Sequence, residues 1–204
     1  MPRDPRARSA MRVAVVAVLF LLVAGCAAAP FDPTGPCSGD GSAAGSYPDL
    51  EAVIPKTYNG AAPSDLDSGR ACTDAGLGTY RSHGVMELRF AGATWSTGDQ
   101  SGVSLAVLAD ADGPPLDVAW VVEFYETTAR AGKNVQSVET SDYSVTGAVA
   151  RKIDVLNGDS YQSVVVWPSD GRIAVALVAN RVQDIQTKDA HEKVVRTAVD
   201  AFGG

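Results

Sequence analysis

The sequence lacks the signatures of the common enzyme classes. It has no Gly-x-Ser-x-Gly elbow of a serine hydrolase, no Ser-x-x-Lys pair and no His-Glu-x-x-His zinc helix. Neither a phosphate-binding P-loop nor a dinucleotide-binding glycine pattern is present. His83 and His191 are the only histidines that could act as bases or metal ligands. We therefore expect a protein that is not an enzyme and that uses no cofactor or metal.

Positive charge is scarce beyond the first 25 residues. The whole chain carries a net charge of −7, of which residues 1–25 contribute +3 from four arginines and one aspartate, so the remainder carries −10. A protein this acidic repels phosphate backbones, and nucleic acid is excluded as a partner. Solubility alone explains the acidity, and binding of a cationic ligand is the alternative. A hydrophobic content of 46% is that of an ordinary folded domain.

The longest apolar run, from Val13 to Ala24, is too short to cross a membrane as a permanent helix. A helix of about 12 residues spans roughly 18 Å, whereas the hydrocarbon core of a bilayer is about 30 Å thick. Arginines precede the run whether translation starts at Met1 or at Met11. A basic start followed by an apolar segment of this length is typical of an export signal.

The end of this run resembles the lipobox of bacterial prolipoproteins in the sequence Leu22-Val23-Ala24-Gly25-Cys26. The resemblance implies cleavage after Gly25, diacylglycerol on the Cys26 thiol and, often, an added acyl chain on the new amine. Residues 1–25 would then be the signal peptide, and the mature protein would be lipid-anchored at the extracytoplasmic face of a bacterial membrane. Each buried methylene contributes about 0.8 kcal/mol, so two or three chains suffice as an anchor. An ordinary signal peptide with an incidental cysteine is the alternative.

The next segment, residues 26–46, is rich in Gly, Ala, Ser and Pro and predicts a flexible tether. Residues 47–204 are the expected globular domain. After processing, Cys37 and Cys72 are left, and an even pair in an exported protein predicts a disulfide. Closing its loop of about 36 residues would stabilise the fold by roughly 3 to 4 kcal/mol. A metal pair or a redox thiol is the competing interpretation, although neither cysteine lies in a CxxC pattern.

Periodicity and turn residues indicate an α+β fold with a single antiparallel sheet. Asn-Gly, Asp-Gly and Thr-Gly breaks separate four apolar runs in the second half and predict a meander of hairpins. Strands are expected at Val85–Ala91, Val103–Ala109, Val135–Val145, Ala148–Leu156, Tyr161–Trp167 and Ile173–Asn180. Because both faces of the last strand are apolar, we expect it to be central and covered on each side.

Helices are expected to pack on this sheet. The segment Leu116–Ala131 fits both helical and alternating spacing, and its length and preceding prolines favour a helix. An amphipathic C-terminal helix is expected at Asp189–Phe202, with Asp189 as its cap. Shorter helices are expected at Tyr47–Ile54, capped by Ser46, and at Cys72–Ser82. This order of elements resembles the small envelope domains related to PsbP and Mog1, including a family of mycobacterial lipoproteins.

Several residues could contact a ligand or partner, each with a simpler interpretation beside it. Trp95 lies in a predicted loop, where it could be a binding contact or fold back over the core, which we favour. Trp120 is a second such contact, although a core position explains it more simply. His83 could be a base but more simply belongs to a turn, and His191 is expected on a solvated helix face. The Asp110-x-Asp112-Gly113 fragment of a calcium loop is interpreted as a turn.

Three functions follow from these expectations. The first is a non-catalytic module that binds an envelope protein or maintains an envelope structure. The second is a carrier or sensor of a small ligand, which could be apolar, held between the sheet and the helix predicted at Leu116–Ala131. The third is a hydrolase that uses scattered carboxylates such as Glu87, Glu123 and Asp154. The missing catalytic signatures favour the first.

Overall fold

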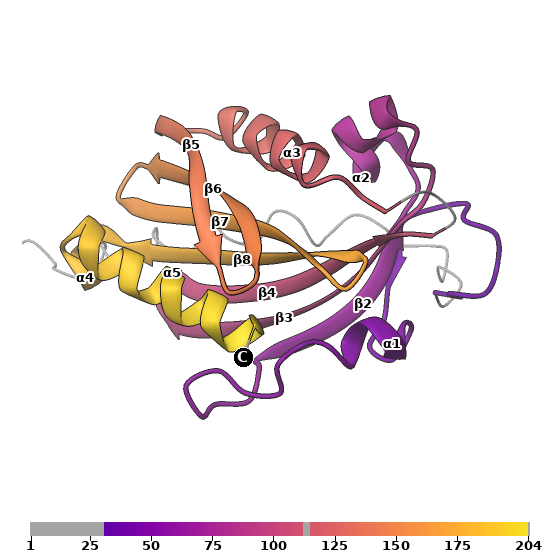
Figure 1. Cartoon of the computed structure of the whole chain (residues 1–204), viewed down its shortest axis with the longest axis horizontal. Helices are drawn as coiled ribbons and strands as arrows, with labels where there is room; N and C mark the ends of the chain where they lie inside the picture. Colours follow the sequence, from indigo (N-terminus) through magenta and orange to yellow (C-terminus); the bar gives the residue numbers. More distant parts are fainter. Residues whose placement is uncertain (1–30, 112–114, 204) are drawn as a thin grey trace, which may run out of the picture. The chain divides into compact units, whose positions relative to one another are not determined.

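The computed structural model describes residues 31–111 and 115–203, which form one compact unit from Phe31 onward (Figure 1). The expected signal peptide, lipobox and Cys26 lie outside the described residues, as do residues 112 and 113 of the turn predicted at 110–113. The fold is α+β, as predicted, with one antiparallel sheet of eight strands in the order β1-β2-β3-β4-β8-β7-β6-β5. The strands are β1 (Gly41–Ser42), β2 (Asp65–Ala71), β3 (Leu88–Gly98), β4 (Ser101–Asp110), β5 (Val135–Val145), β6 (Ala148–Asn157), β7 (Ser160–Ser169) and β8 (Arg172–Arg181).

Two antiparallel meanders lie side by side in this sheet. Strands β1 to β4 form the first and β5 to β8 the second, and β8 returns to pair with β4. The second meander confirms the hairpins predicted from the turn residues. Gly147, Gly158 and Gly171 all have positive φ, and Asp170 joins Gly171 in the left-handed region. These are the backbone angles that tight hairpin turns require.

Helices cover both faces of the sheet (Figure 1). One face carries α1 (Pro48–Glu51) and α5 (Lys188–Gly203), and the other carries α2 (Asp74–Leu77), the 3-10 helix η1 (Gly78–His83) and α3 (Val118–Arg130). A short helix, α4 (Val182–Ile185), connects β8 to α5. The alternating side chains of β8 enter two separate cores: Ala174, Ala176 and Val178 face α5, whereas Ile173 and Val175 face α3. The prediction of a central, doubly covered strand is confirmed.

Helices form in the segments where they were predicted, but they begin and end at different residues. The ambiguous segment before residue 131 is the helix α3, and Asp117 caps it by accepting a hydrogen bond from the amide of Ala119. Helix α5 begins one residue before the predicted Asp189, because the side chain of Thr187, not Asp189, accepts from the amide of Ala190. The Ser46 cap of α1 is also wrong, since its hydroxyl donates to the carbonyl of Ala43.

The first meander departs most from the sequence-based expectation. Strand β2 was not predicted, because its sequence has no β-branched residue and its buried positions are Ser68, Gly69 and Arg70. It is a strand because β1 and β3 flank it on both sides. Gly69 is required there, since a Cβ atom would lie 2.3 Å from the carbonyl oxygen of Gly41. The close approach of the neighbouring backbones therefore makes this segment a strand, although its residues have low strand propensity.

Candidate functional site

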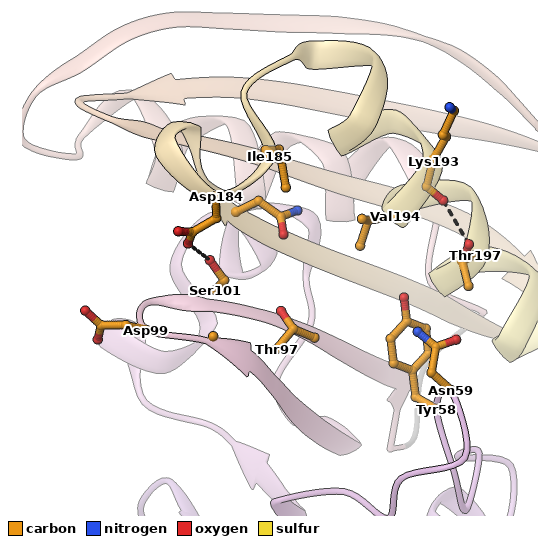
Figure 2. A pocket seen from close by; sticks show the side chains of 12 residues that line it. Tyr58, Asn59, Thr97, Asp99, Ser101, Asp184, Ile185, Lys193, Val194 and Thr197 are labelled. Carbon is orange, nitrogen blue, oxygen red and sulfur yellow. Dashed lines mark hydrogen bonds between the residues drawn. The ribbon is translucent and has the colours of Figure 1, made fainter.

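A trough opens on the face of the sheet that α5 covers, where the β3–β4 hairpin meets the end of β8 (Figure 2). Its volume of about 590 Å³ lies in the range of small-molecule sites, about 300–1,000 Å³. One wall is formed by α4 and α5 and the other by the turn at Tyr58. The trough is lined by Tyr58, Asn59, Thr97, Gly98, Asp99, Ser101, Asn180, Asp184, Ile185, Lys193, Val194 and Thr197.

The floor of the trough is polar, although it continues an apolar face. Trp95, Val103 and Val178 lie opposite one another on β3, β4 and β8, and all three are buried in the core. The next side chains on this face, toward the hairpin, are Thr97, Ser101 and Asn180. Three neighbouring strands thus change from apolar to hydroxyl or amide side chains at one level. This change is visible in the sequence but becomes informative only when the strands are aligned.

A series of buried hydrogen bonds, on the side of Asn180 away from the trough, fixes the orientation of its side-chain amide. The Nδ2 of Asn180 lies 2.9 Å from Nδ1 of His191, and Nε2 of His191 lies 2.9 Å from the hydroxyl of Ser163. Ser163 in turn donates to Oδ1 of Asp154 at 2.5 Å. Because this hydroxyl donates to Asp154, it accepts from His191, whose Nε2 therefore carries a proton. With Nδ1 accepting from the NH₂ of Asn180, the imidazole is neutral. The NH₂ group of Asn180 is therefore occupied by its hydrogen bond to His191. The side-chain carbonyl oxygen of Asn180 has no hydrogen bond within the described residues.

The environment of His191 contradicts the prediction of a solvated helix face. The side chain is only 2% exposed and sits between α5 and the sheet. Burial lowers its pKa, and the nearby Asp154 and Glu192 oppose that shift only in part. Sequence reasoning missed this because His191 follows directly after the exposed Asp189 and the half-exposed Ala190, and a helix face is assigned correctly only when its partner is known.

Ser163 and His191 do not form a hydrolase dyad. Ser163 is fully buried, and its proton goes to Asp154 and not to the imidazole. A nucleophilic serine needs the opposite polarity, with histidine accepting its proton. Lys152 completes this cluster between Asp154, at 3.1 Å, and Glu192, at 2.6 Å. Burial lowers the pKa of Lys152, but the hydrogen bonds to these two carboxylates outweigh it and the net shift is upward.

Of the three charged residues on the rim of the trough, one has an ion pair within the described part of the chain. Asp99 pairs with Arg181 at 3.2 Å, and Asp184 accepts a hydrogen bond from Ser101 at 3.3 Å. Lys193 has no ion pair within the described part of the chain, and its ammonium points away from Tyr58 (Figure 2). The floor of the trough therefore presents neutral hydrogen-bonding groups, and the charged groups lie on its rim.

A smaller pocket of about 190 Å³ adjoins the trough and shares Tyr58, Asn59 and Thr97 with it. Trp95 lines this pocket, but the residue is only 3% exposed. Its indole Nε1 donates to the carbonyl of Ala61 at 3.1 Å. Trp95 lies within β3 and not in the loop expected from the sequence. The favoured interpretation, that Trp95 covers the core, matches this position.

Trp120 lies on α3, on the other face of the sheet and away from the trough. The half-buried indole stacks on the imidazole of His83, with ring centroids 4.8 Å apart and an interplanar angle of 9°. Nε2 of His83 lies 2.7 Å from a carboxylate oxygen of Glu123. Trp95 and Trp120, the two residues predicted as possible ligand contacts, therefore lie on opposite faces of the sheet. His83 connects η1 to α3 through its contacts with Trp120 and Glu123.

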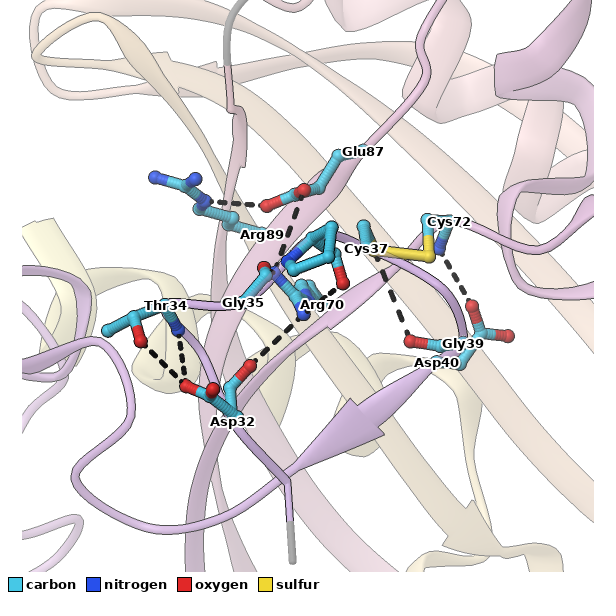
Figure 3. A network of polar contacts seen from close by, with 11 residues as sticks. Asp32, Thr34, Gly35, Cys37, Gly39, Asp40, Arg70, Cys72, Glu87 and Arg89 are labelled. Atoms are coloured by element: carbon cyan, nitrogen blue, oxygen red, sulfur yellow. Dashed lines mark hydrogen bonds and ion pairs between the residues drawn. A yellow bond between two sulfur atoms is a disulfide. The ribbon is translucent and has the colours of Figure 1, made fainter. Parts of the chain in front are cut away.

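The segment from Phe31 to Ser46 belongs to the folded domain, which corrects the prediction of a tether up to residue 46. Its backbone carbonyls surround the guanidinium of Arg70, which donates to Asp32 at 3.1 Å, Gly35 at 2.8 Å and Pro36 at 3.2 Å (Figure 3). Arg70 is only 5% exposed. Composition was misleading because hydrogen bonds to the backbone hold most of the segment in place, and Phe31 alone supplies an apolar contact with the core.

The predicted disulfide between Cys37 and Cys72 is present in the same network (Figure 3). Beside it, Asp40 accepts hydrogen bonds from the amides of Cys72 at 2.7 Å and Thr73 at 2.9 Å, and from the Thr73 hydroxyl. Burial raises the pKa of Asp40, but these hydrogen bonds outweigh it and the net shift is downward. The disulfide and Asp40 together fasten the N-terminal segment to the start of α2.

The scattered carboxylates considered for a hydrolase have separate partners. Glu87 pairs with Arg70 and Arg89, Glu123 pairs with His83, and Asp154 pairs with Lys152. Among the residues that the structure describes, no three His, Cys, Asp or Glu side chains are arranged to hold a metal ion.

Comparison of the chain with protein-family models and with curated proteins finds no match in either set. In residues 31–111 and 115–203, no helix is long and apolar enough to span a membrane.

Proposed function

We propose that this chain is a lipid-anchored exported protein whose domain is a non-catalytic binding module, with the trough as its binding site. The observation that carries the proposal is the trough floor. Asn180 is buried and held by a chain of hydrogen bonds that reaches Asp154, and Ser101 is buried and bonded to Asp184. Polar groups positioned by a supporting layer bind a ligand without a large loss of side-chain entropy.

Two features support export and anchoring. The lipobox-like sequence before Cys26 favours acylation of that cysteine. The disulfide between Cys37 and Cys72 favours an oxidising compartment, because cytosolic thiols are kept reduced. Both features agree with a mature protein at the extracytoplasmic face of a bacterial membrane.

The folded N-terminal segment shortens the proposed tether. Residues 27–30 alone separate Cys26 from Phe31, the first residue of the compact unit. Even a fully extended backbone over the five Cα–Cα distances from Cys26 to Phe31 reaches no more than about 18 Å. An acylated Cys26 would therefore keep the domain near the bilayer, whereas a tether of twenty residues would let it range widely.

Substitution of Cys26 by serine in the native host tests the anchor. We expect Cys26→Ser to move the protein from the membrane fraction to the soluble exported fraction, and lipid mass to vanish from the N-terminal peptide. A variant that stays fully in the membrane fraction would contradict the anchor. Ser38→Ala is the matched control, since it changes an exposed side chain after the lipobox and leaves both Cys26 and the disulfide intact.

A carrier of a small ligand is the second candidate function, and the volume of the trough favours it. Native mass spectrometry of the protein from its own host distinguishes the two. A retained small molecule of constant mass would favour the carrier, whereas a bare chain that captures a macromolecular partner would favour the binding module.

A further inference from the structure

The chemistry of the trough limits what it can bind. A carrier of an apolar ligand needs an enclosed apolar cavity, but this floor consists of Thr97, Ser101 and Asn180. Apolar groups line both walls, with Ile185 and Val194 on the helices and the ring of Tyr58 opposite them (Figure 2). Burial of a hydrocarbon chain against this floor would still leave the carbonyl of Asn180 and the hydroxyl of Thr97 without partners, which costs about 1–3 kcal/mol for each group.

A charged ligand fits poorly as well. Asp99 and Asp184 lie on the rim and would repel an anion, and the ammonium of Lys193 points away from the floor (Figure 2). A cation would find one carboxylate, Asp184, without a cationic partner in the described part of the chain, because Asp99 is already paired with Arg181. A positive charge on the occupant would therefore gain one exposed interaction at the rim and none at the neutral floor.

A neutral ligand that carries many hydroxyl groups can pair with the polar floor and needs no charged partner on the rim. The carbonyl of Asn180 is an acceptor, because its NH₂ is bonded to His191. The hydroxyls of Thr97 and Tyr58 donate or accept and point toward α5 (Figure 2). A pyranose ring has hydroxyls at its rim and an apolar C–H face, which could lie against the wall of Ile185 and Val194. Mixed walls of this kind fix both the position and the orientation of a ligand.

The adjoining pocket extends the site in one direction. It shares Tyr58, Asn59 and Thr97 with the trough and continues past Trp95 to Ser64. Because the two hollows share part of their lining, a linear chain of repeating units could occupy both of them, whereas a single small molecule would fill only one. We propose that the trough binds a neutral oligosaccharide, an inference that rests on the proposed binding function and specifies its ligand.

Calorimetric titration of the full chain in detergent tests the proposal. The probes are cellotriose, maltotriose, mannotriose and triacetylchitotriose, with an alanine–serine hexapeptide and palmitate as the other ligand classes. We expect at least one trisaccharide to bind, and Thr97→Val to weaken it about fivefold through the loss of one hydrogen bond. Thr97 is exposed, so its substitution leaves the fold intact. The matched control, Thr127→Val on the exposed side of α3, should bind as the unmodified chain does.

The outcomes separate the two proposals. Binding of the hexapeptide or palmitate alone, weakened by Thr97→Val, would overturn the saccharide and keep the trough as a binding site. If saccharide binding is equally unaffected by both substitutions, it occurs elsewhere and the inference is wrong. If no probe binds, the saccharide inference fails and the trough loses its support as the binding site.

Discussion

Protonation of His191 should destabilise the fold in a defined pH window. Burial lowers the pKa of this side chain below its ordinary value of 6.5. A proton on Nδ1 would also face the NH₂ of Asn180, which donates to that nitrogen in the neutral state. The folded protein therefore prefers the neutral imidazole for both electrostatic and hydrogen-bonding reasons.

The sign of the effect follows from proton linkage. Because the pKa of His191 is lower in the folded than in the unfolded state, the unfolded chain binds more protons between the two values. The stability contributed by neutral His191 is fully present above pH 6.5 and is lost as the pH falls through the pKa of the folded state. One proton corresponds to a slope of at most about 1.4 kcal/mol per pH unit.

Urea unfolding at pH 5, 6, 7 and 8, followed by circular dichroism, measures this slope. We expect His191→Gln to lower the stability at pH 8 by about 1–3 kcal/mol, because it breaks the chain from Asn180 to Ser163. The variant should also flatten the decline in stability below pH 6.5 relative to the unmodified chain. His83→Gln is the control, since His83 is partly exposed and pairs with Glu123. An equal pH slope in His191→Gln and the unmodified chain would refute the reasoning.

Two further predictions concern the N-terminal segment. Cys72→Ser should lower the free energy of unfolding by roughly 4 kcal/mol, since it opens a loop with a sequence separation of 35 residues, and an unchanged urea midpoint would contradict this. Arg70→Gln should lower the stability by about 3 kcal/mol and expose residues 32–36 to proteases, because it removes the charged donor from three backbone carbonyls. Arg172→Gln is the control, since it removes only a surface pair with Asp49, and equal protection of the segment in both variants would show that Arg70 does not hold it.

The second meander could be predicted because its information is local. Glycines at the turns and alternating Val and Ile residues within the strands lie a few residues apart, and they specify hairpins without reference to the rest of the chain. The apolar rows of β8 predicted its central place for the same reason. The ends of α5 and the role of Thr187 as its cap differ by one or two residues, since helix ends depend on backbone geometry that periodicity does not encode.

The trough could not be predicted because its parts come from distant segments. The floor combines the end of β3, the start of β4 and the end of β8, and the walls come from the Tyr58 turn and from α5. His191 was assigned to solvent because the sequence does not show that Ser163 and Asn180 lie beneath it. A polar residue on an apolar face is ambiguous until its partners are known.

The amino-acid sequence alone determined the α+β class, the pairing of β5 to β8, the partnership of Cys37 with Cys72 and the amphipathic face of the last helix. These features rest on periodicity, on turn residues and on the count of cysteines. Only the tertiary structure decided that β8 returns to pair with β4, that Arg70 gathers residues 32–36 into the domain, and that three strand ends form a polar floor. The physical reason is that such contacts join groups far apart in the chain, and their free energy arises only when the whole sheet is assembled.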